Sequence, residues 1–173
     1  MAGFGGQGVL LIGTLVAQAA IEAGLNTTFM PAYGVEMRGG TANCTVVVSD
    51  DEIGSPVISA PMAGIMFTLA ALEKFEQKLK PSALLIANSD MINRDAIKRK
   101  DLKVVYIPFN STAKEVGNPR AANMVALGAF LAKTGVVQIE GVEKAMRSVL
   151  AEKNHRFIPA NIKAVQKGME LAK

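Results

Sequence analysis

The sequence predicts an α/β fold, specifically a Rossmann-like three-layer domain with a mostly parallel sheet and a helical C-terminal portion. A glycine-rich turn at residues 3–8 leads directly into a small, apolar segment of helical composition. Apolar and β-branched runs then alternate with helical patterns, which is typical of parallel strands joined by right-handed crossovers. The last third of the chain keeps apolar residues at helical spacing and adds no further strand pattern.

The N-terminal elements follow from composition and from helix and strand breakers. Residues 9–23 favour a helix, and Gly24 stands where a left-handed C-terminal cap is expected. Residues 27–30 predict a short strand that Pro31 ends. Residues 41–49 predict a β-branched strand, and its three consecutive valines indicate burial on both faces.

The middle of the chain begins with an uncharged stretch, residues 53–72, that is about long enough to cross a bilayer. Pro56 and Pro61 break it, so we interpret it as a loop followed by a buried strand at residues 65–69, and we expect no membrane association. A helix at residues 70–80 follows, with an apolar stripe on one side.

The remaining elements complete a single domain over residues 1–173. Strands are expected at residues 83–87 and 103–107, where short apolar runs end at polar residues or proline. Helices are expected at residues 120–133, 142–153 and 158–171, with Asn118-Pro119-Arg120 as the start of the first of these. A chain of this length fits one hydrophobic core.

Composition excludes several functional classes. The formal charge is +4, but basic residues are mixed with acidic ones, so we expect no nucleic-acid binding. We interpret the run Lys98-Arg99-Lys100 as a solvated helix end. The single cysteine, Cys44, cannot form an internal disulfide or hold an iron–sulfur cluster, and its apolar surroundings predict an inert buried thiol. No secretion signal is visible, so cytoplasm is the expected location.

The glycine-rich turn is the first candidate site. Gly3, Gly5 and Gly8 have the G-x-G-x-x-G spacing that lets backbone approach a phosphate at a helix N-terminus. Four residues are therefore candidates for cofactor contact: Gly5, Gly6, Gln7 and Gly8. The acidic residue that a ribose would need after the second strand is absent, which disfavours NAD. The alternative is that the glycines only let the first helix pack tightly. Only Met1 and Ala2 precede the turn, so the strand in front of it is missing or much shortened.

The second candidate site lies between two predicted strands, at residues 33–40. Gly39 and its glycine neighbours free the backbone, while Glu36 and Arg38 stand two residues apart. The guanidinium of Arg38 suits a phosphate or a partner's carboxylate. An internal Glu–Arg network or a subunit contact is the alternative interpretation. We expect no catalytic residue and no metal ligand in this chain.

These residues together resemble a known family. The co-linear segments that carry the resemblance are Gly3-Phe4-Gly5-Gly6-Gln7-Gly8-Val9, Tyr33-Gly34-x-Glu36-x-Arg38-Gly39-Gly40-Thr41 and Cys44-Thr45-Val46. They resemble the gamma subunit of the 2-oxoacid:ferredoxin oxidoreductases, most closely that of the 2-oxoglutarate enzyme. Looser similarity extends to residues 123–129 and to Asn161 in the last predicted helix.

The resemblance implies a subunit of a hetero-oligomeric oxidoreductase. Such a complex oxidatively decarboxylates a 2-oxoacid to an acyl-coenzyme A and passes the electrons to ferredoxin. We expect 2-oxoglutarate as the substrate, with 2-oxoisovalerate and pyruvate behind it. Thiamine diphosphate, Mg²⁺ and iron–sulfur clusters would lie on alpha, beta or delta subunits, and this chain would support assembly and coenzyme A access. A stand-alone nucleotide- or coenzyme A-binding module and a purely structural subunit remain the alternatives.

Overall fold

A computed structural model describes residues 1–34 and 40–173, and it confirms the α/β fold. The described residues form a six-stranded sheet in the order β2-β3-β1-β4-β5-β6. The strands are β1 (Ala2–Phe4), β2 (Asn26–Tyr33), β3 (Thr41–Ser49), β4 (Ala63–Met66), β5 (Leu84–Asn88) and β6 (Lys103–Ile107). Strands β1, β4, β5 and β6 are parallel, whereas β3 is antiparallel to both β1 and β2. The sheet is mostly parallel, as predicted, with one reversed strand that the sequence did not reveal.

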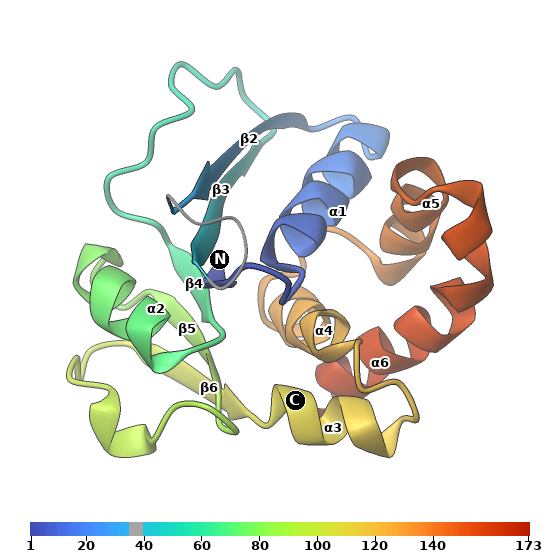
Figure 1. The fold of residues 1–173 in the computed structure, drawn as a ribbon. Helices are drawn as coiled ribbons and strands as arrows, with labels where there is room; N and C mark the ends of the chain where they lie inside the picture. Colours follow the sequence, from blue (N-terminus) through green and yellow to red (C-terminus); the bar gives the residue numbers. More distant parts are fainter. Residues whose placement is uncertain (35–39) are drawn as a thin grey trace.

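The helices cover the two faces of the sheet unequally. They are α1 (Val9–Glu22), α2 (Leu69–Phe75), α3 (Phe109–Glu115), α4 (Ala122–Thr134), α5 (Ile139–Val149) and α6 (Ile158–Leu171). Figure 1 shows α2 on one face and α1 and α4 on the other, with α5 and α6 outside them. Helix α5 packs on α1 and helix α6 packs on α4. The predicted helical C-terminal portion therefore adds a second tier of helices on one side of the sheet.

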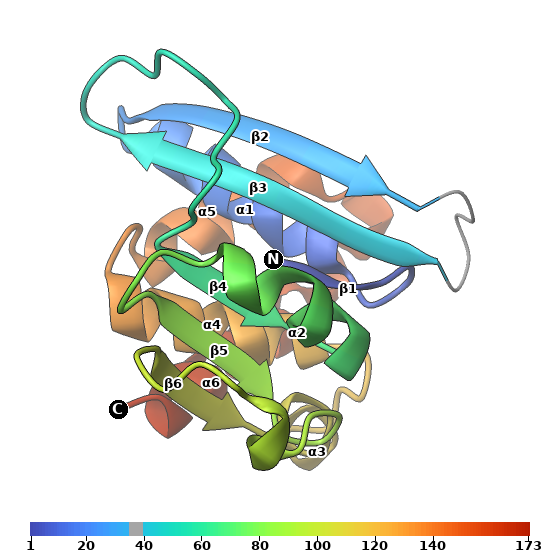
Figure 2. The ribbon, with the colours of Figure 1, turned by 90° about the vertical axis from the view of Figure 1, so that its left-hand side faces the viewer.

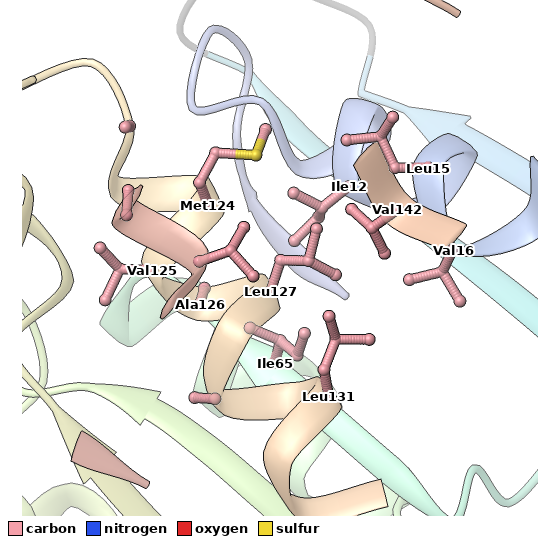
Figure 3. Close-up of a cluster of buried hydrophobic side chains, with 14 of the residues drawn as sticks. Ile12, Leu15, Val16, Ile65, Met124, Val125, Ala126, Leu127, Leu131 and Val142 are labelled. Atoms are coloured by element: carbon pink, nitrogen blue, oxygen red, sulfur yellow. The ribbon is translucent and has the colours of Figure 1, made fainter. Parts of the chain in front are cut away.

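The larger part of the core lies between the sheet and helices α1 and α4. Ile12 and Leu15 of α1, Leu127 of α4 and Ile65 of β4 are fully or almost fully buried there, and Figure 3 shows their side chains meeting. Burial of each such side chain contributes about 1.5–3 kcal/mol relative to exposure. This core fixes α1, and with it the glycine-rich turn, against the strands.

The two strands of the β2–β3 hairpin differ from their predictions. Strand β2 does not end at Pro31 but continues to Tyr33. It is the edge strand of the sheet, and an edge strand tolerates a proline whose missing N–H would face outward. Strand β3 has the predicted bounds, but its valines are only half-buried. Helix α1 covers one face of this hairpin and no described helix covers the other (Figure 2), so burial on both faces was wrong.

Two helical predictions also need correction. The segment Asn118-Pro119-Arg120 does not start a helix, because α4 begins at Ala122 after a turn. Helix α3 was not predicted, since its sequence contains Asn, Ser and Thr, which are weak helix formers. No helix in residues 1–34 and 40–173 is long and apolar enough to cross a membrane.

The basic run at residues 98–100 follows a short 3-10 helix at Arg94–Ala96, and its two lysines are exposed as predicted, but Arg99 is half-buried and makes structural contacts. The buried Glu76 carboxylate accepts the N–H groups of Lys98 and Arg99, at 2.7 and 2.9 Å. The Arg99 guanidinium donates to the carbonyl of Leu79 at 2.6 Å and pairs with Asp101. Its hydrogen bond to Asp101 holds the pKa of that carboxyl well below its usual range. The run thus ties the segment after α2 to the segment that enters β6.

Candidate functional site

The glycine-rich turn joins β1 to α1 at the edge where the parallel strands end. Gly6 and Gly8 have φ angles of +94° and +73°, which other residues adopt at a cost. The Gln7 side chain closes the turn, because its Oε1 accepts the N–H of Phe4 at 2.7 Å. The Gln7 N–H in turn donates to the Phe4 carbonyl at 3.2 Å. The structure therefore brings the predicted residues Gly5 to Gly8 together in one closed turn.

Neighbouring elements hold this turn on one side and leave the other side open. The Gly5 N–H donates to the Gly40 carbonyl at 2.9 Å. Asn123, near the start of α4, donates from Nδ2 to the Gly8 carbonyl at 3.4 Å. A Cβ on Gly8 would collide with the Asn123 amide, whereas a Cβ on Gly6 would meet no atom of residues 1–34 or 40–173 within 4 Å. The backbone at Gly6 is therefore accessible to a ligand.

The N-terminus of α1 gives this opening its electrostatic character. Gly8 is the N-cap residue and supplies no capping side chain, and the first turn of α1 carries no acidic residue. The first amides of a helix have no intrahelical acceptor, and the helix dipole places a partial positive charge there. Amides and dipole together suit an anion such as a phosphate.

The turn also lies at the topological switch point of the sheet. Strands β1 and β4 are neighbours, and Figures 1 and 2 show that α1 leaves β1 toward one face while α2 leaves β4 toward the other. Open α/β sheets bind ligands in the crevice at such a point. After β4, the Thr68 hydroxyl caps α2 by accepting the Ala71 N–H at 3.3 Å.

Two polar residues at the same edge were missed by the sequence reasoning. Asn88 is fully buried at the end of β5, and its Nδ2 donates to the Phe67 carbonyl at 3.2 Å and to Asn110 Oδ1 at 3.0 Å. The Asp90 carboxylate accepts two amides in the first turn of α3, at 2.7 and 2.8 Å. Polar residues directly after a buried strand were the available signal. They fix the ends of β4, β5 and β6 relative to one another.

The second candidate segment is described only at its ends. Glu36, Arg38 and Gly39 lie outside the described residues. At the ends, the Gly34 N–H donates to the Thr41 carbonyl at 2.7 Å, and the Gly40 carbonyl accepts from Gly5. The two candidate sites are therefore adjacent through Gly5 and Gly40, and the roles of Glu36, Arg38 and Gly39 stay predictions.

Cys44 and His155, the single cysteine and histidine of the sequence, both contact backbone carbonyls of the fold. Cys44 is 2% exposed, and burial raises the pKa of its thiol, which favours the unreactive protonated form. His155 lies with Nε2 2.9 Å from the Leu150 carbonyl. Within the described part of the chain, no three His, Cys, Asp or Glu side chains gather in a way that could hold a metal ion.

Sequence comparisons relate the chain to known proteins along nearly its whole length. The family model described as pyruvate ferredoxin/flavodoxin oxidoreductase matches residues 1–171. Ketoisovalerate oxidoreductase subunit VorA of Methanothermobacter marburgensis is 36% identical over the whole chain, which spans only 36% of VorA. The 2-oxoglutarate synthase subunit KorC of the same organism is 35% identical, and the match covers 99% of this chain and 94% of KorC.

Solved structures give the same picture. A keto/oxoacid ferredoxin oxidoreductase gamma subunit from Geobacter sulfurreducens has a TM-score of 0.82 at 34% identity, covering 99% of this chain and 95% of that one. The 2-oxoglutarate:ferredoxin oxidoreductase from Magnetococcus marinus, with 2-oxoglutarate, coenzyme A and succinyl-CoA bound, has a TM-score of 0.88 at 26% identity. That match covers 99% of this chain and 30% of the Magnetococcus chain.

Proposed function

This chain belongs to the pyruvate ferredoxin/flavodoxin oxidoreductase family, and from that membership we propose that it is the gamma subunit of a multi-subunit 2-oxoacid:ferredoxin oxidoreductase. Membership confirms the family resemblance drawn from the glycine-rich turn and the segment at residues 33–40. The observation that carries the proposal is coverage: the chain spans 94% of KorC and 95% of the Geobacter gamma subunit. It spans about a third of VorA and of the Magnetococcus chain, so in such longer proteins it corresponds to one part.

The proposed complex decarboxylates a 2-oxoacid, joins the acyl group to coenzyme A and passes two electrons to ferredoxin. An iron–sulfur cluster commonly needs four cysteine thiolates, and this chain has one cysteine. We therefore assign the clusters to the alpha, beta or delta partner subunits, and, as the family resemblance implies, thiamine diphosphate and Mg²⁺ as well. The gamma subunit would complete the assembly and help to form the approach for coenzyme A.

The proposed substrate is 2-oxoglutarate. KorC is named a 2-oxoglutarate synthase subunit, and its length is matched almost completely. The Magnetococcus structure carries 2-oxoglutarate, coenzyme A and succinyl-CoA. Ketoisovalerate is the second candidate, because VorA has the same level of identity over this chain.

The proposed contact with coenzyme A rests on the glycine-rich turn. Its open side at Gly6 and the positive end of α1 suit the phosphates of that cofactor. The other proposed contacts are Gly5, Gln7 and Gly8 in the turn, with Glu36, Arg38 and Gly39 in the adjacent segment. Of these, Arg38 is the side chain best suited to a phosphate, since its planar donors match two oxygens at once.

Reconstitution tests the assignment. The chain would be produced alone and together with alpha and beta partners, and coenzyme A-dependent ferredoxin reduction would be measured with 2-oxoglutarate, ketoisovalerate and pyruvate. We expect no turnover from the chain alone, and the highest kcat/KM with 2-oxoglutarate from the complex. Turnover by the isolated chain would contradict the subunit assignment, and a preference for ketoisovalerate would favour the second candidate.

Substitution of Arg38 separates coenzyme A contact from a purely structural role. In the assembled enzyme, Arg38→Ala is expected to raise the KM for coenzyme A about tenfold, the loss of one charge-assisted hydrogen-bonded contact. The KM for the 2-oxoacid should stay unchanged, and Arg38→Lys should recover part of the loss. Arg147→Ala on the outer helix α5, where the arginine pairs with Glu143, is the matched control. Weakened assembly with an unchanged coenzyme A KM would instead assign Arg38 to a subunit contact.

A further inference from the structure

The β2–β3 hairpin has one face that packs on α1 and one that does not. A Cβ on Gly13 of α1 would lie 3.0 Å from the Phe29 ring and 2.5 Å from Cys44 Sγ, so these two side chains point toward α1. Successive side chains of a strand point to opposite faces, and the cross-strand partners Met30 and Thr45 therefore point away from α1. Figure 2 views the hairpin from this second side. We call it the hairpin face, and its residues are Thr28, Met30, Ala32, Asn43, Thr45 and Val47.

The hairpin carries no charge. Strands β2 and β3 contain no Asp, Glu, Lys, Arg or His, although 20% of the residues of the whole chain are charged. The uncovered face of an antiparallel pair is ordinarily polar, yet here Met30 is 39% exposed and Val47 lies beside it on the next strand. Few charged residues combined with exposed methionine is the composition found at the centre of protein–protein interfaces.

The same uncharged surface continues to the glycine-rich turn. Phe4 at the end of β1 is paired with Thr41 of β3. It points to the same side of the sheet as Ala2, which shares a buried cluster with Leu72 of α2. Phe4 is 36% exposed, and Leu69 at the start of α2 is 42% exposed. A protein seated on the hairpin face therefore reaches the turn across apolar side chains.

The dimensions suit a contact between subunits. Strand β2 has eight residues, so β2 and β3 together form a plane of roughly 27 by 10 Å. This is about a third of the roughly 800 Å² that one partner contributes to a standard interface. The loop between β3 and β4 extends the surface, because it crosses one end of the hairpin (Figure 2) and is uncharged over residues 53–62. In this loop Val57 and Met62 are 67% and 73% exposed.

The proposed chemistry names the occupant of this surface. Thiamine diphosphate is assigned to a partner subunit, and the acyl group that forms there has to meet the thiol of the coenzyme A proposed to bind at the turn. The partner that carries thiamine diphosphate therefore has to stand beside the turn. Helix α1 covers the other face of the hairpin, and α5 packs outside α1. The hairpin face is thus the open surface that leads to the turn.

We propose that the hairpin face is the surface on which the partner carrying thiamine diphosphate docks, through an uncharged and largely apolar patch of that partner. This inference rests on the proposed function and adds to it the face by which the chain joins the complex. A charge buried against the hairpin face would lose its hydration without gaining a partner, so the contact excludes charge on both sides. Its affinity should therefore depend little on salt, since screening acts on charges.

The test measures the Kd of the full chain for the purified partner that carries thiamine diphosphate. Met30→Lys and Thr45→Lys each place a charge on the hairpin face and are expected to raise this Kd about tenfold or more. Gln166→Lys, at an exposed position of the outer helix α6, is the matched control and should leave the Kd unchanged. A Tm within about 3 °C of that of the unsubstituted chain shows that a variant is folded.

Two measurements on the unsubstituted chain need no variant to fold. Its Kd for this partner should change less than about twofold between about 0.05 and 0.5 M salt. Oxidation of the exposed Met30 thioether by peroxide should slow about tenfold or more when the partner is bound, because the contact covers the sulfur.

The outcomes separate this inference from the proposed function. If the unsubstituted chain binds its partner but the lysine variants bind equally well, or Met30 oxidises at the same rate in the complex, the docking surface is overturned and the proposed function stands. If the unsubstituted chain binds no partner subunit, the proposed function fails. A chain that is dimeric alone and becomes monomeric with Met30→Lys would assign the face to a second copy. Weaker binding only to a cluster-bearing subunit would assign it to that subunit, and either result overturns the proposal.

Discussion

Glycines in two regions of this molecule serve opposite purposes. In the turn between β1 and α1, Gly6 has a positive φ, and none of the residues that the structure describes lies within 4 Å of where its side chain would begin. At the crossing of α4 and α6, a Cβ on Gly128 would collide with the Val165 carbonyl, and a Cβ on Gly168 would collide with the Val125 carbonyl. One region leaves backbone accessible, and the other brings two backbones into contact.

Helix α4 connects the two regions. Its first turn contains Asn123, which bonds Gly8 in the glycine-rich turn, and its middle contains Gly128, which packs on α6. The position of the turn therefore depends on how closely α4 and α6 approach. The difference teaches that a glycine's role follows from what stands beside it in space, and both kinds of role can be tested by adding one methyl group.

The largest effect is expected from Gly128→Ala. The added methyl group meets backbone of α6, which cannot rotate away as a side chain can. Overpacking of a core costs roughly 1–3 kcal/mol when side chains can adjust, and we expect about 3 kcal/mol or more here. Thermal unfolding would show this as a Tm loss of roughly 10 °C.

Gly141→Ala on α5 is the matched control for that substitution. Its Cβ would approach the Ala19 methyl group at 3.7 Å, an ordinary contact, and alanine is favoured over glycine in helices by about 1 kcal/mol. We expect unchanged or higher stability. Equal destabilisation by the two substitutions would show that the α4–α6 approach is not close, and the comparison between the two regions would fail.

The sequence predicted the elements whose signals are local. Strand β3 and helix α6 have the expected bounds because β-branched composition and helical spacing lie within them. Helix α3 was missed because its own residues are weak helix formers and the carboxylate that accepts its first N–H groups belongs to Asp90, some 20 residues earlier in the chain. The reversed direction of β3 was also missed, because its pairing with β1 joins segments about 40 residues apart and leaves no local pattern in the sequence.

The candidate site was predictable in part. The spacing of Gly3, Gly5 and Gly8 located the turn, because a tight turn of this kind needs glycine at fixed positions. The contact between Asn123 and Gly8 joins residues 115 positions apart, and no local pattern reports it. Glu36 and Arg38 were chosen by residue type, and their roles stay predictions.

Gly8→Ala is expected to have the second largest effect. Its φ of +73° costs alanine roughly 1–2 kcal/mol, and its methyl group also collides with the Asn123 amide. We expect a total loss of about 2 kcal/mol by denaturant unfolding. If the collision contributes, Gly8→Ala combined with Asn123→Ala should destabilise less than the sum of the two single substitutions. Strict additivity of the two losses would show that the Asn123 side chain does not limit the space at Gly8.

Gly6→Ala should cost less stability than Gly8→Ala, because only its φ of +94° opposes the substitution. We expect about 1 kcal/mol, or a Tm loss of roughly 3 °C. In the assembled enzyme the KM for coenzyme A should also rise, since the methyl group fills the open side of the turn. An unchanged KM would show that the ligand does not approach Gly6.

The smallest effect on stability is expected at Gln7, where two substitutions separate the turn's closure from its charge. Gln7→Ala removes the acceptor for the Phe4 N–H and should cost about 0.5–1 kcal/mol, the net contribution of one hydrogen bond. Gln7→Glu keeps an acceptor, and its negative charge is favourable near the N-terminus of α1, so unfolding at pH 7 should show stability within about 0.5 kcal/mol of the unsubstituted chain.

The negative charge of Gln7→Glu opposes a phosphate, so the KM for coenzyme A in the assembled enzyme should rise about tenfold with Gln7→Glu and less with Gln7→Ala. An unchanged KM with Gln7→Glu would show that the turn does not face the cofactor. Gln7→Ala, the variant that loses more stability, is thus expected to be the one that raises the KM less.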